Sequence, residues 1–274
     1  MAVSRRKHWF DANVKKALAD DALRAAIADT TVKKMASRAA AIAQVDQFQA
    51  LRDLAARIKQ HTIDHLDGYL DEFVRRFEAA GGRVHFAATA AEANEHIVRI
   101  ARDNGLTLCA KAKSMTTEET HLNEALEAAG VRAVETDLGE FVVQLDHDRP
   151  SHIVTPIIHK NRATVARAFV RELGAEYTED PESLTQIARR YLRDVFRRCD
   201  MGVTGVNFAI AETGTLCVCT NEGNGRLTMT RPRVHVALMG IEKVIPRMAD
   251  LAVFTKLLSR SGTGQPITVY ASLI

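Results

Sequence analysis

The stretch Asn207–Arg231, with the sequence NFAIAETGTLCVCTNEGNGRLTMTR, predicts two strands joined by a tight turn and followed by a glycine-rich polar loop. Its apolar side chains recur mostly at every second position, as strands that pack on a core require. These are Phe208, Ile210, Leu216 and Val218. The turn and the loop are polar instead. Because α/β proteins usually bind ligands at strand ends, the turn and the loop are the first candidate site.

The composition is that of an ordinary globular protein, with 274 residues, 46% hydrophobic and 26% charged. A net charge of +3 and an aromatic content of 5% argue against a nucleic-acid partner. The basic cluster in residues 1–10 is not followed by the apolar segment of a secretory signal, and no apolar run reaches the length of a membrane span. We therefore predict a cytoplasmic protein with no membrane span.

The order of predicted elements indicates an α/β fold. Before residue 81 apolar residues recur at helical spacing, which predicts two to four helices, the last over 47–80 and ended by Gly81-Gly82. Later strands and helices alternate, which predicts a mainly parallel sheet with helices on both faces, made mixed by the hairpin. We expect an N-terminal helical extension, 1–80, and an α/β domain, 81–274. Besides the hairpin, the expected strands are 83–87, 106–110, 131–134, 140–145, 152–155, 234–239 and 267–271, and the expected helices are 90–103, 117–129, 161–173, 181–199 and 246–259.

Lys111 and Lys113 lie two residues apart at the carboxyl end of a predicted strand, so their side chains point the same way. Thr116 and Glu119 have capping-box spacing at the start of the next helix. Two ammonium groups beside free helix amides form a natural anion site, which would include Ser114. Alternatively, they are solvated lysines on a surface loop.

Carboxylates and a histidine supply candidate acid–base groups. The segment 135–140 brings three carboxylates into a predicted loop, and Glu140, which enters a predicted strand, is the candidate among them. His159 precedes a helix, where an imidazole can transfer protons or orient a substrate, or can be a partly exposed histidine without a special role. Glu212, in the hairpin turn, is a candidate base or a solvated turn residue.

The glycine-rich loop permits a close approach of backbone N–H groups to an anionic ligand, and nearby arginines can pair with a carboxylate or phosphate. It is not a P-loop, because no Gly-Lys-Ser/Thr follows it. The predicted ligand-binding residues are Lys111, Lys113, Ser114, Thr213, Gly214, Thr215, Asn221, Glu222, Gly223, Asn224, Gly225, Arg226 and Arg231.

Cys217 and Cys219 lie on one face of a predicted strand, as a metal or redox pair or as two small buried residues. We favour the second interpretation, because free cysteine is among the most buried residue types. With Cys109 and Cys199 they form no recognisable zinc or iron–sulfur ligand pattern. We predict no metal and no cofactor in this chain.

Six segments, in order along the chain, resemble the lactate-utilization domain family, in its lactate utilization protein B branch. The resemblance covers about residues 45–274 and implies a fold similar to that of the ribose-phosphate isomerase and CoA-transferase group. The segments are KAKSM (111–115), ETDLGE (135–140), PIIHK (156–160), GVNFAIAETGT (205–215), NEGNGR (221–226) and GIEKV (240–244).

The resemblance implies a subunit of an iron–sulfur complex that oxidises L-lactate to pyruvate in bacterial-type metabolism, with other lactate-utilization subunits as partners. Family members of this branch continue into a ferredoxin-like half that holds [4Fe–4S] clusters for electron transfer. We expect that half to be missing from this sequence, so that the chain is truncated and inactive alone. Its own site would hold a small carboxylate or a nucleotide, with Glu212 or His159 as the base.

Two other functions stay open. One is an independent enzyme, similar to CoA transferases or sugar-phosphate isomerases, in which Glu212 is the nucleophile or base. The other is a non-catalytic scaffold that positions clusters and partner subunits.

Overall fold

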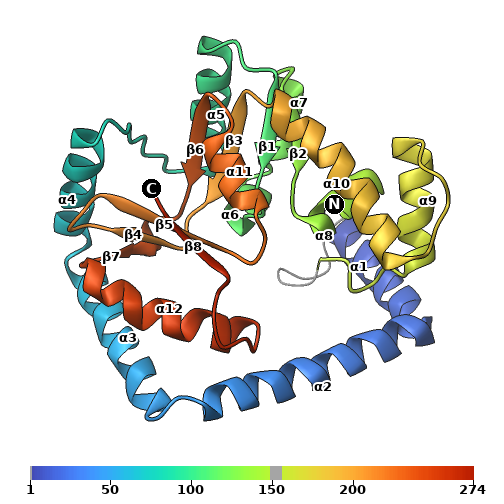
Figure 1. Cartoon of the computed structure of the whole chain (residues 1–274), viewed down its shortest axis with the longest axis horizontal. Coiled ribbons are helices and arrows are strands. Elements are labelled where there is room, and N and C mark those ends of the chain that lie inside the picture. Colours follow the sequence, from blue (N-terminus) through green and yellow to red (C-terminus); the bar gives the residue numbers. More distant parts are fainter. Residues whose placement is uncertain (1, 149–155) are drawn as a thin grey trace.

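The computed structural model describes residues 2–148 and 156–274, and these have the expected mixed α/β architecture. The first sheet has four parallel strands in the order β2 (Arg132–Glu135), β1 (Leu108–Lys111), β3 (Met201–Gly205) and β6 (Val234–Leu238) (Figure 1). Cys109 of β1 is level with Ala133 of β2 and Met201 of β3. Most residues of β1, β2 and β3 are buried, as in parallel strands covered on both faces.

Helices cover both faces of this sheet. Because side chains alternate along a strand, Ala110 faces one side and packs with Phe141 and Phe169, while Cys109 faces the other and packs with Ile97 and Leu126. The helices on the first side are α8 (Leu138–Leu145), α9 (Arg162–Leu173) and α10 (Pro181–Arg198). Those on the second side are α5 (Ala90–Asp103) and α7 (Leu122–Ala128), and α6 (Met115–Glu119) joins β1 to α7.

The predicted hairpin forms a second sheet instead of widening the first. The chain passes from β3 into β4 (Phe208–Ile210), which pairs antiparallel with β5 (Thr215–Thr220). β5 continues into α11 (Asn224–Thr230), which packs against β3. The full order of the second sheet is β7 (Val244–Ile245), β4, β5 and β8 (Tyr270–Leu273), with the short helix η1 (Ile241–Lys243) before β7 and α12 (Met248–Gly262) against one face.

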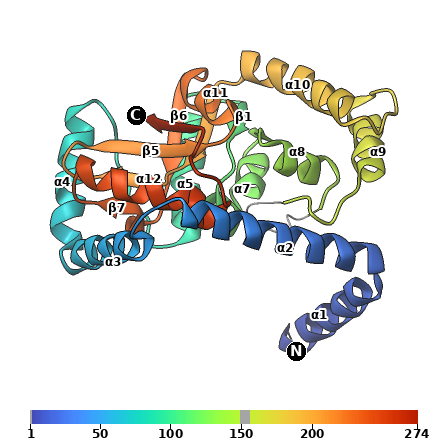
Figure 2. The same ribbon diagram turned by 60° about the horizontal axis from the view of Figure 1, so that its bottom comes forward.

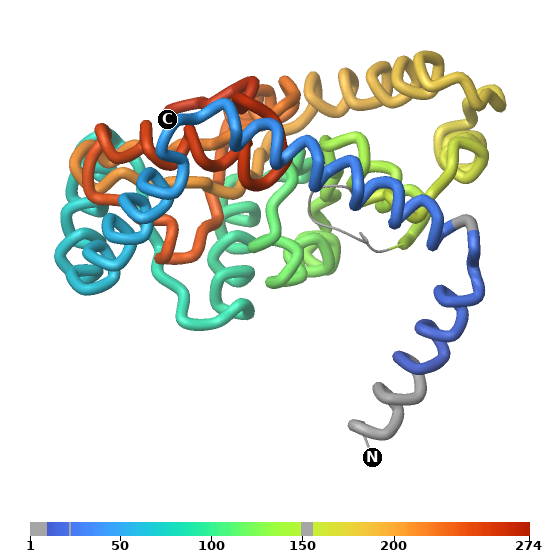
Figure 3. The backbone as a smooth tube through the Cα atoms, turned by 90° about the horizontal axis from the view of Figure 1, so that it is seen from below, coloured from blue at the N-terminus to red at the C-terminus, as the bar shows by residue number. Residues whose placement is uncertain are grey.

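Four helices open the described chain: α1 (Ala2–Ala19), α2 (Asp21–Ala43), α3 (Phe48–Asp64) and α4 (Leu66–Ala79). Phe48 of α3 and Phe73 of α4 are buried in the core of the second sheet. α2 packs against α12, and α1 extends away from the two sheets (Figures 2 and 3). The boundary at residue 80 between a helical extension and an α/β domain therefore stays a prediction, since α3 and α4 share a hydrophobic core with the second sheet.

Most predicted elements are found within a few residues of their expected ends, but four predictions are wrong. Residues 83–87 form no strand, and residues 140–145 belong to helix α8, which the Asp137 side chain caps by accepting from the N–H groups of Gly139 and Glu140. The helix expected over 117–129 breaks at His121, and the one over 47–80 breaks at His65. The strand expected at 152–155 lies outside the described residues.

Gly214 fixes the hairpin turn against α4. Its φ of +69° lies in the left-handed region, and a Cβ there would stand 2.5 Å from the backbone nitrogen of Phe77. We expect Gly214→Ala to lower the free energy of unfolding by about 2 kcal/mol or more, because backbone strain and a backbone clash add. Urea unfolding measures the change. Gly223→Ala is the control, since a Cβ at Gly223 meets nothing within 4 Å; equal losses in both variants would contradict this account.

Candidate functional site

The carboxyl ends of β1, β2 and β3 meet at one edge of the parallel sheet, the edge at which α/β proteins bind ligands. Lys111 ends β1 and is level with Glu135, which ends β2. Gly205 ends β3 and lies so close to the segment after β1 that a Cβ on it would stand 2.8 Å from Ser114 Oγ. Lys111, Glu135 and Ser114 are thus gathered at this edge, next to Gly205 of β3.

The ammonium group of Lys111 is buried at the centre of this edge. Its side chain is 1% exposed, and Nζ lies 2.7 Å from Glu135 Oε1 and 2.9 Å from Glu118 Oε1. Nζ also donates to Thr117 Oγ1 at 2.9 Å. Because a lysine ammonium has three donors, these three contacts use its hydrogen-bonding capacity. Lys111 was predicted to bind an anionic ligand. In the structure its ammonium group instead joins the residues of this edge.

The local sequence explains how Glu118 reaches Lys111. Ser114, not Thr116, is the N-cap of α6, and its Oγ accepts from the N–H of Thr117. The one-turn helix that follows directs Thr117 and Glu118 back over the end of β1. Ser114 was predicted to contact a ligand. In the structure it caps helix α6 and so fixes the positions of Thr117 and Glu118.

Burial and charge have opposite effects on the pKa of Lys111 and on the pKa of Glu135. Burial alone would lower the pKa of Lys111, but the carboxylates of Glu135 and Glu118 outweigh it and raise the pKa. Burial raises the pKa of Glu135 more than Lys111 and Asn123 lower it. Oε2 of Glu135 is buried without a hydrogen-bond partner in the described part of the chain. The pKa of both groups is therefore raised, that of Lys111 by its carboxylate partners and that of Glu135 by burial.

Lys113 and Glu140 form a second, more accessible pair beside the first. Lys113 Nζ lies 3.8 Å from Glu140 Oε1, and the Lys113 side chain is 24% exposed. Burial, followed by the nearby charges of Glu135 and Glu118, raises the pKa of Glu140 to about 7, although Lys113 and Lys111 oppose the shift. A carboxyl group with this pKa exchanges a proton near neutral pH, which is the property of a general acid or base.

The glycine-rich loop lies against this edge. Asn224 Nδ2 is 3.4 Å from Thr136 Oγ1, at the end of β2. Burial raises the pKa of Glu222, with a further contribution from Asp137, and Lys113 lowers it. Gly225 packs tightly, since a Cβ there would stand 2.6 Å from Thr220 Cγ2. The structure thus brings Asn224 and Glu222 together with the Lys113 turn.

Other predicted residues of this loop point elsewhere. The guanidinium of Arg226 lies 5.0 Å from the ring centroid of Tyr270, over β8. Asn221 makes hydrogen bonds with Gln265 and with the backbone of Val269, so it fastens the loop to the segment before β8. Gly223 begins α11 as its N-cap. Arg231 ends α11 and lines a cavity on the α10 side of the edge.

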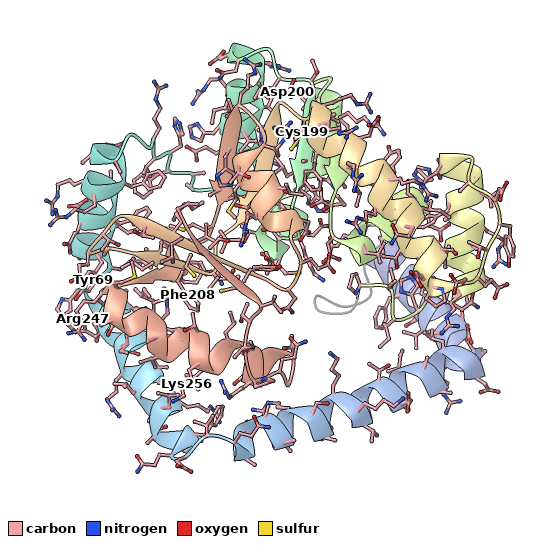
Figure 4. The ribbon with its side chains drawn as sticks, in the orientation of Figure 1. Tyr69, Cys199, Asp200, Phe208, Arg247 and Lys256 are labelled. Carbon is pink, nitrogen blue, oxygen red and sulfur yellow. The ribbon has the colours of Figure 1, made fainter. Side chains whose placement is uncertain are left out.

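The structure separates the hairpin turn from this edge. Glu212, Thr213 and Gly214 precede β5 and Thr215 begins it, whereas the glycine-rich loop follows it, so the turn and the loop lie at opposite ends of the strand. Glu212 Oε2 accepts from the N–H of Met248 at 2.8 Å and so caps α12, and Thr213 Oγ1 donates to Thr215 Oγ1. Near Glu212 is Arg247, which with Tyr69 lines a different cavity (Figure 4). The structure therefore does not bring Glu212 to the Lys113 turn, and its role as a base stays a prediction.

His159 is also apart from the cluster. Its Nε2 lies 2.8 Å from Asp148 Oδ2, and the adjacent Lys160 pairs with Asp146 and Asp148. Both carboxylates follow the end of α8, whereas Glu140 is in its first turn. Among the three predicted acid–base groups, Glu140 is therefore the one that the structure places beside Lys113.

Three arginines of α10 were not foreseen. Arg189, Arg193 and Arg197 line the same cavity as Arg231, next to Thr136. Their four-residue spacing in the sequence was the available signal, because residues four apart share one face of a helix.

The cysteines do not assemble a ligand set for an iron–sulfur cluster. Cys109 and Cys199 belong to core clusters on opposite faces of the parallel sheet, and Cys217 and Cys219 lie in β5 with their Sγ atoms 3.8 Å apart. Burial raises the pKa of Cys109 far above its ordinary value, which disfavours the thiolate that a metal requires. Four thiolates around one cluster are not available from these positions.

Three carboxylates of the edge come near enough to one another to share a cation. Ligand atoms from Glu118, Glu135 and Glu140 lie within 4.8 Å of one another. The Lys111 ammonium already pairs with the carboxylates of Glu118 and Glu135, so it supplies the positive charge that a metal ion would otherwise bring to them.

The fold and its charged edge define an α/β protein with a candidate ligand site at the carboxyl ends of parallel strands. Residues 70–274 match the LUD domain, so the chain belongs to the LUD domain family. It is similar to "Lactate utilization protein B" of Shouchella clausii (strain KSM-K16), with 40% identity over 273 residues, 99% of this chain and 58% of that protein. The proteins of the same name from Bacillus cereus (strain AH820) and Bacillus cytotoxicus are 39% identical over 100% of this chain and 57% of their own length.

The chain thus spans a little under three fifths of the length of these relatives. No solved structure matches it significantly. In the described residues, no helix has both the length and the apolar character needed to cross a bilayer.

Replacing Lys111 should expose how much the edge depends on it. Lys111→Met leaves the Glu135 carboxyl buried without its cation, so we expect the free energy of unfolding at neutral pH to fall by about 3–5 kcal/mol. Urea unfolding gives the value. Lys111→Met/Glu135→Gln should recover most of this loss, since the second substitution removes the unpaired buried charge of Glu135; a double variant as unstable as the single one would show that packing, not charge, is responsible.

Replacing Glu140 should change how stability depends on pH. Between its ordinary pKa of 4.5 and its folded value of about 7, the folded state binds more protons than the unfolded state. The stability from this group is therefore complete below about pH 4.5 and is lost as pH rises to about 7. Relative to Glu140→Gln, the free energy of unfolding of the wild type should fall by up to about 3 kcal/mol over that range. Urea unfolding of both proteins across the range tests this, and a constant difference would contradict it.

Proposed function

We propose that this chain acts in the utilization of L-lactate, as the ligand-binding α/β part of an iron–sulfur complex that oxidises L-lactate to pyruvate. The similarity to proteins named "Lactate utilization protein B" supports the pathway, and membership of the LUD domain family agrees with it. The structural observation that carries the proposal is the pair formed by Lys113 and Glu140 at the ligand-binding edge of the parallel sheet. The other lactate-utilization proteins are the proposed partners, and the cytoplasm is the proposed location.

The pair has the two groups that a 2-hydroxy acid requires. The partly exposed ammonium of Lys113 binds the carboxylate of lactate. Glu140, with a pKa of about 7, accepts the hydroxyl proton as the C–O bond becomes a carbonyl. Lys111 keeps Glu135 and Glu118 in place, so their negative charges continue to raise the pKa of Glu140.

Oxidation of lactate to pyruvate releases two electrons and two protons. Glu140 takes the hydroxyl proton, and the C2 hydrogen leaves with both electrons as a hydride, which a two-electron acceptor elsewhere in the proposed complex would take and pass on as single electrons. In the proposed complex, iron–sulfur clusters held by another part of the assembly supply the electron-transfer chemistry. The cysteine positions described above agree with a cluster held elsewhere.

The alternative of an independent transferase or isomerase depended on Glu212 as nucleophile or base. Because that carboxylate caps α12 and lies at the far end of β5, no observation favours this alternative. A scaffold role differs from our proposal in one respect, since a scaffold does not need to bind lactate.

Binding of lactate by the full chain separates these possibilities. We expect L-lactate and pyruvate to raise the midpoint of thermal unfolding, because a ligand at a hundredfold its dissociation constant adds about 2.7 kcal/mol. Lys113→Ala and Glu140→Gln should abolish the shift. Lys256→Ala, which removes an exposed lysine of α12, should retain it (Figure 4). An absent shift in the wild type, or an equal shift in all variants, would leave the scaffold role as the better account.

A further inference from the structure

A cavity of about 540 Å³ lies between α10, the start of α11 and the end of β2. Its charged residues are Arg189, Arg193 and Arg197 of α10 and Arg231 at the end of α11, and no carboxylate is among the described residues that line it. Phe196 and Leu227 supply apolar surface. The cavity therefore combines up to four positive charges with an apolar wall.

The arginines of α10 form a row along one face of the helix. Residues 189, 193 and 197 are each four apart, and eight residues of helix span about 12 Å. Leu192 and Phe196, which are three residues from members of the row, are buried at the base of the same face. A ligand that contacts the whole row must therefore be extended and carry more than one negative group.

The charges in this row are not compensated by the protein. In the described part of the chain, none of these four guanidinium groups has an ion pair or a side-chain hydrogen bond. Arg198, on another face of α10, is by contrast 3.8 Å from Asp194. Like charges four residues apart on a helix repel and destabilise it. All four arginines are exposed to solvent, and their convergence on one cavity favours an anionic ligand.

We propose that this cavity binds a nucleotide through its di- or triphosphate. The forked guanidinium group matches phosphate oxygens in two-point hydrogen bonds. A chain of two or three phosphates reaches successive arginines, and the base and sugar lie against Phe196 and Leu227. A single small carboxylate such as lactate is too short to engage a row of about 12 Å. The inference goes beyond the proposed function, because it rests on residues other than Lys113 and Glu140.

The position of the cavity places the nucleotide next to the candidate lactate site. Thr136 lines the cavity. Its hydroxyl donates to the backbone oxygen of Lys111 at 2.9 Å and accepts from Asn224 Nδ2 at 3.4 Å. Lys111 and Asn224 belong to the same edge of the sheet as Lys113 and Glu140. The two ligands would thus share one edge of the sheet without sharing their charged contacts.

Calorimetric titration of the full chain with ADP at low salt tests the proposal. We expect ADP to bind, and the dissociation constant to rise about tenfold or more for each arginine lost in Arg193→Gln and in Arg193→Gln/Arg197→Gln. Arg190→Gln is the matched control, since Arg190 is on the same helix and does not line the cavity. Urea unfolding without ligand should show that the variants are at least as stable as the wild type.

Each other outcome is decisive. Absence of ADP binding to the wild type overturns the proposal, as does an equal loss in Arg190→Gln. Inorganic pyrophosphate that binds as tightly as ADP overturns the nucleotide assignment, because Phe196 and Leu227 then contribute nothing. Glu140→Gln should bind ADP as the wild type does, so a failed lactate assay and a failed nucleotide assay are distinguishable.

Discussion

The buried contact of Lys111 with Glu135 and Glu118 is the constraint on which the candidate ligand-binding edge depends. It joins the end of β1 to the end of β2 and holds α6 over both strands. A buried ammonium is stable only when each of its donors has a partner. Thr117 supplies the third partner, and Asn123 of α7 donates to the same Glu135 oxygen. The positions of four elements are therefore set by one charge.

Charged side chains at this edge are arranged in two different ways. Around Lys111 the ammonium group has carboxylate partners, and burial, followed by the charges of Glu135 and Glu118, raises the pKa of Glu140 to about 7. Along α10 the arginines are unmatched in the described part of the chain. A matched cluster gives rigid positions and a tuned pKa, whereas an unmatched row gives attraction for anions. We infer that the first is the place for proton transfer and the second the place for a phosphate chain.

The fold class followed from the alternation of strands and helices, but the pairing of Lys113 with Glu140 did not, because residues 140–145 were expected to form a strand. Three features were beyond the sequence pattern. The run after Asp137 has strand-like apolar residues, but the capping carboxylate makes it a helix. The turn at Glu212 resembled a site, but Gly214 is needed for contact with α4. Lys111 resembled a ligand contact, and only the fold shows that its donors are occupied.

The central claim is that a carboxyl group at this edge is tuned by its neighbours to exchange a proton near neutral pH. Titration of the glutamate side-chain carboxyl carbons by NMR measures this directly, and the spectrum of Glu140→Gln identifies the resonance. We predict that the resonance missing from the variant titrates near pH 7, as burial and the charges of Glu135 and Glu118 require. A midpoint near the ordinary value of 4.5 would contradict the account.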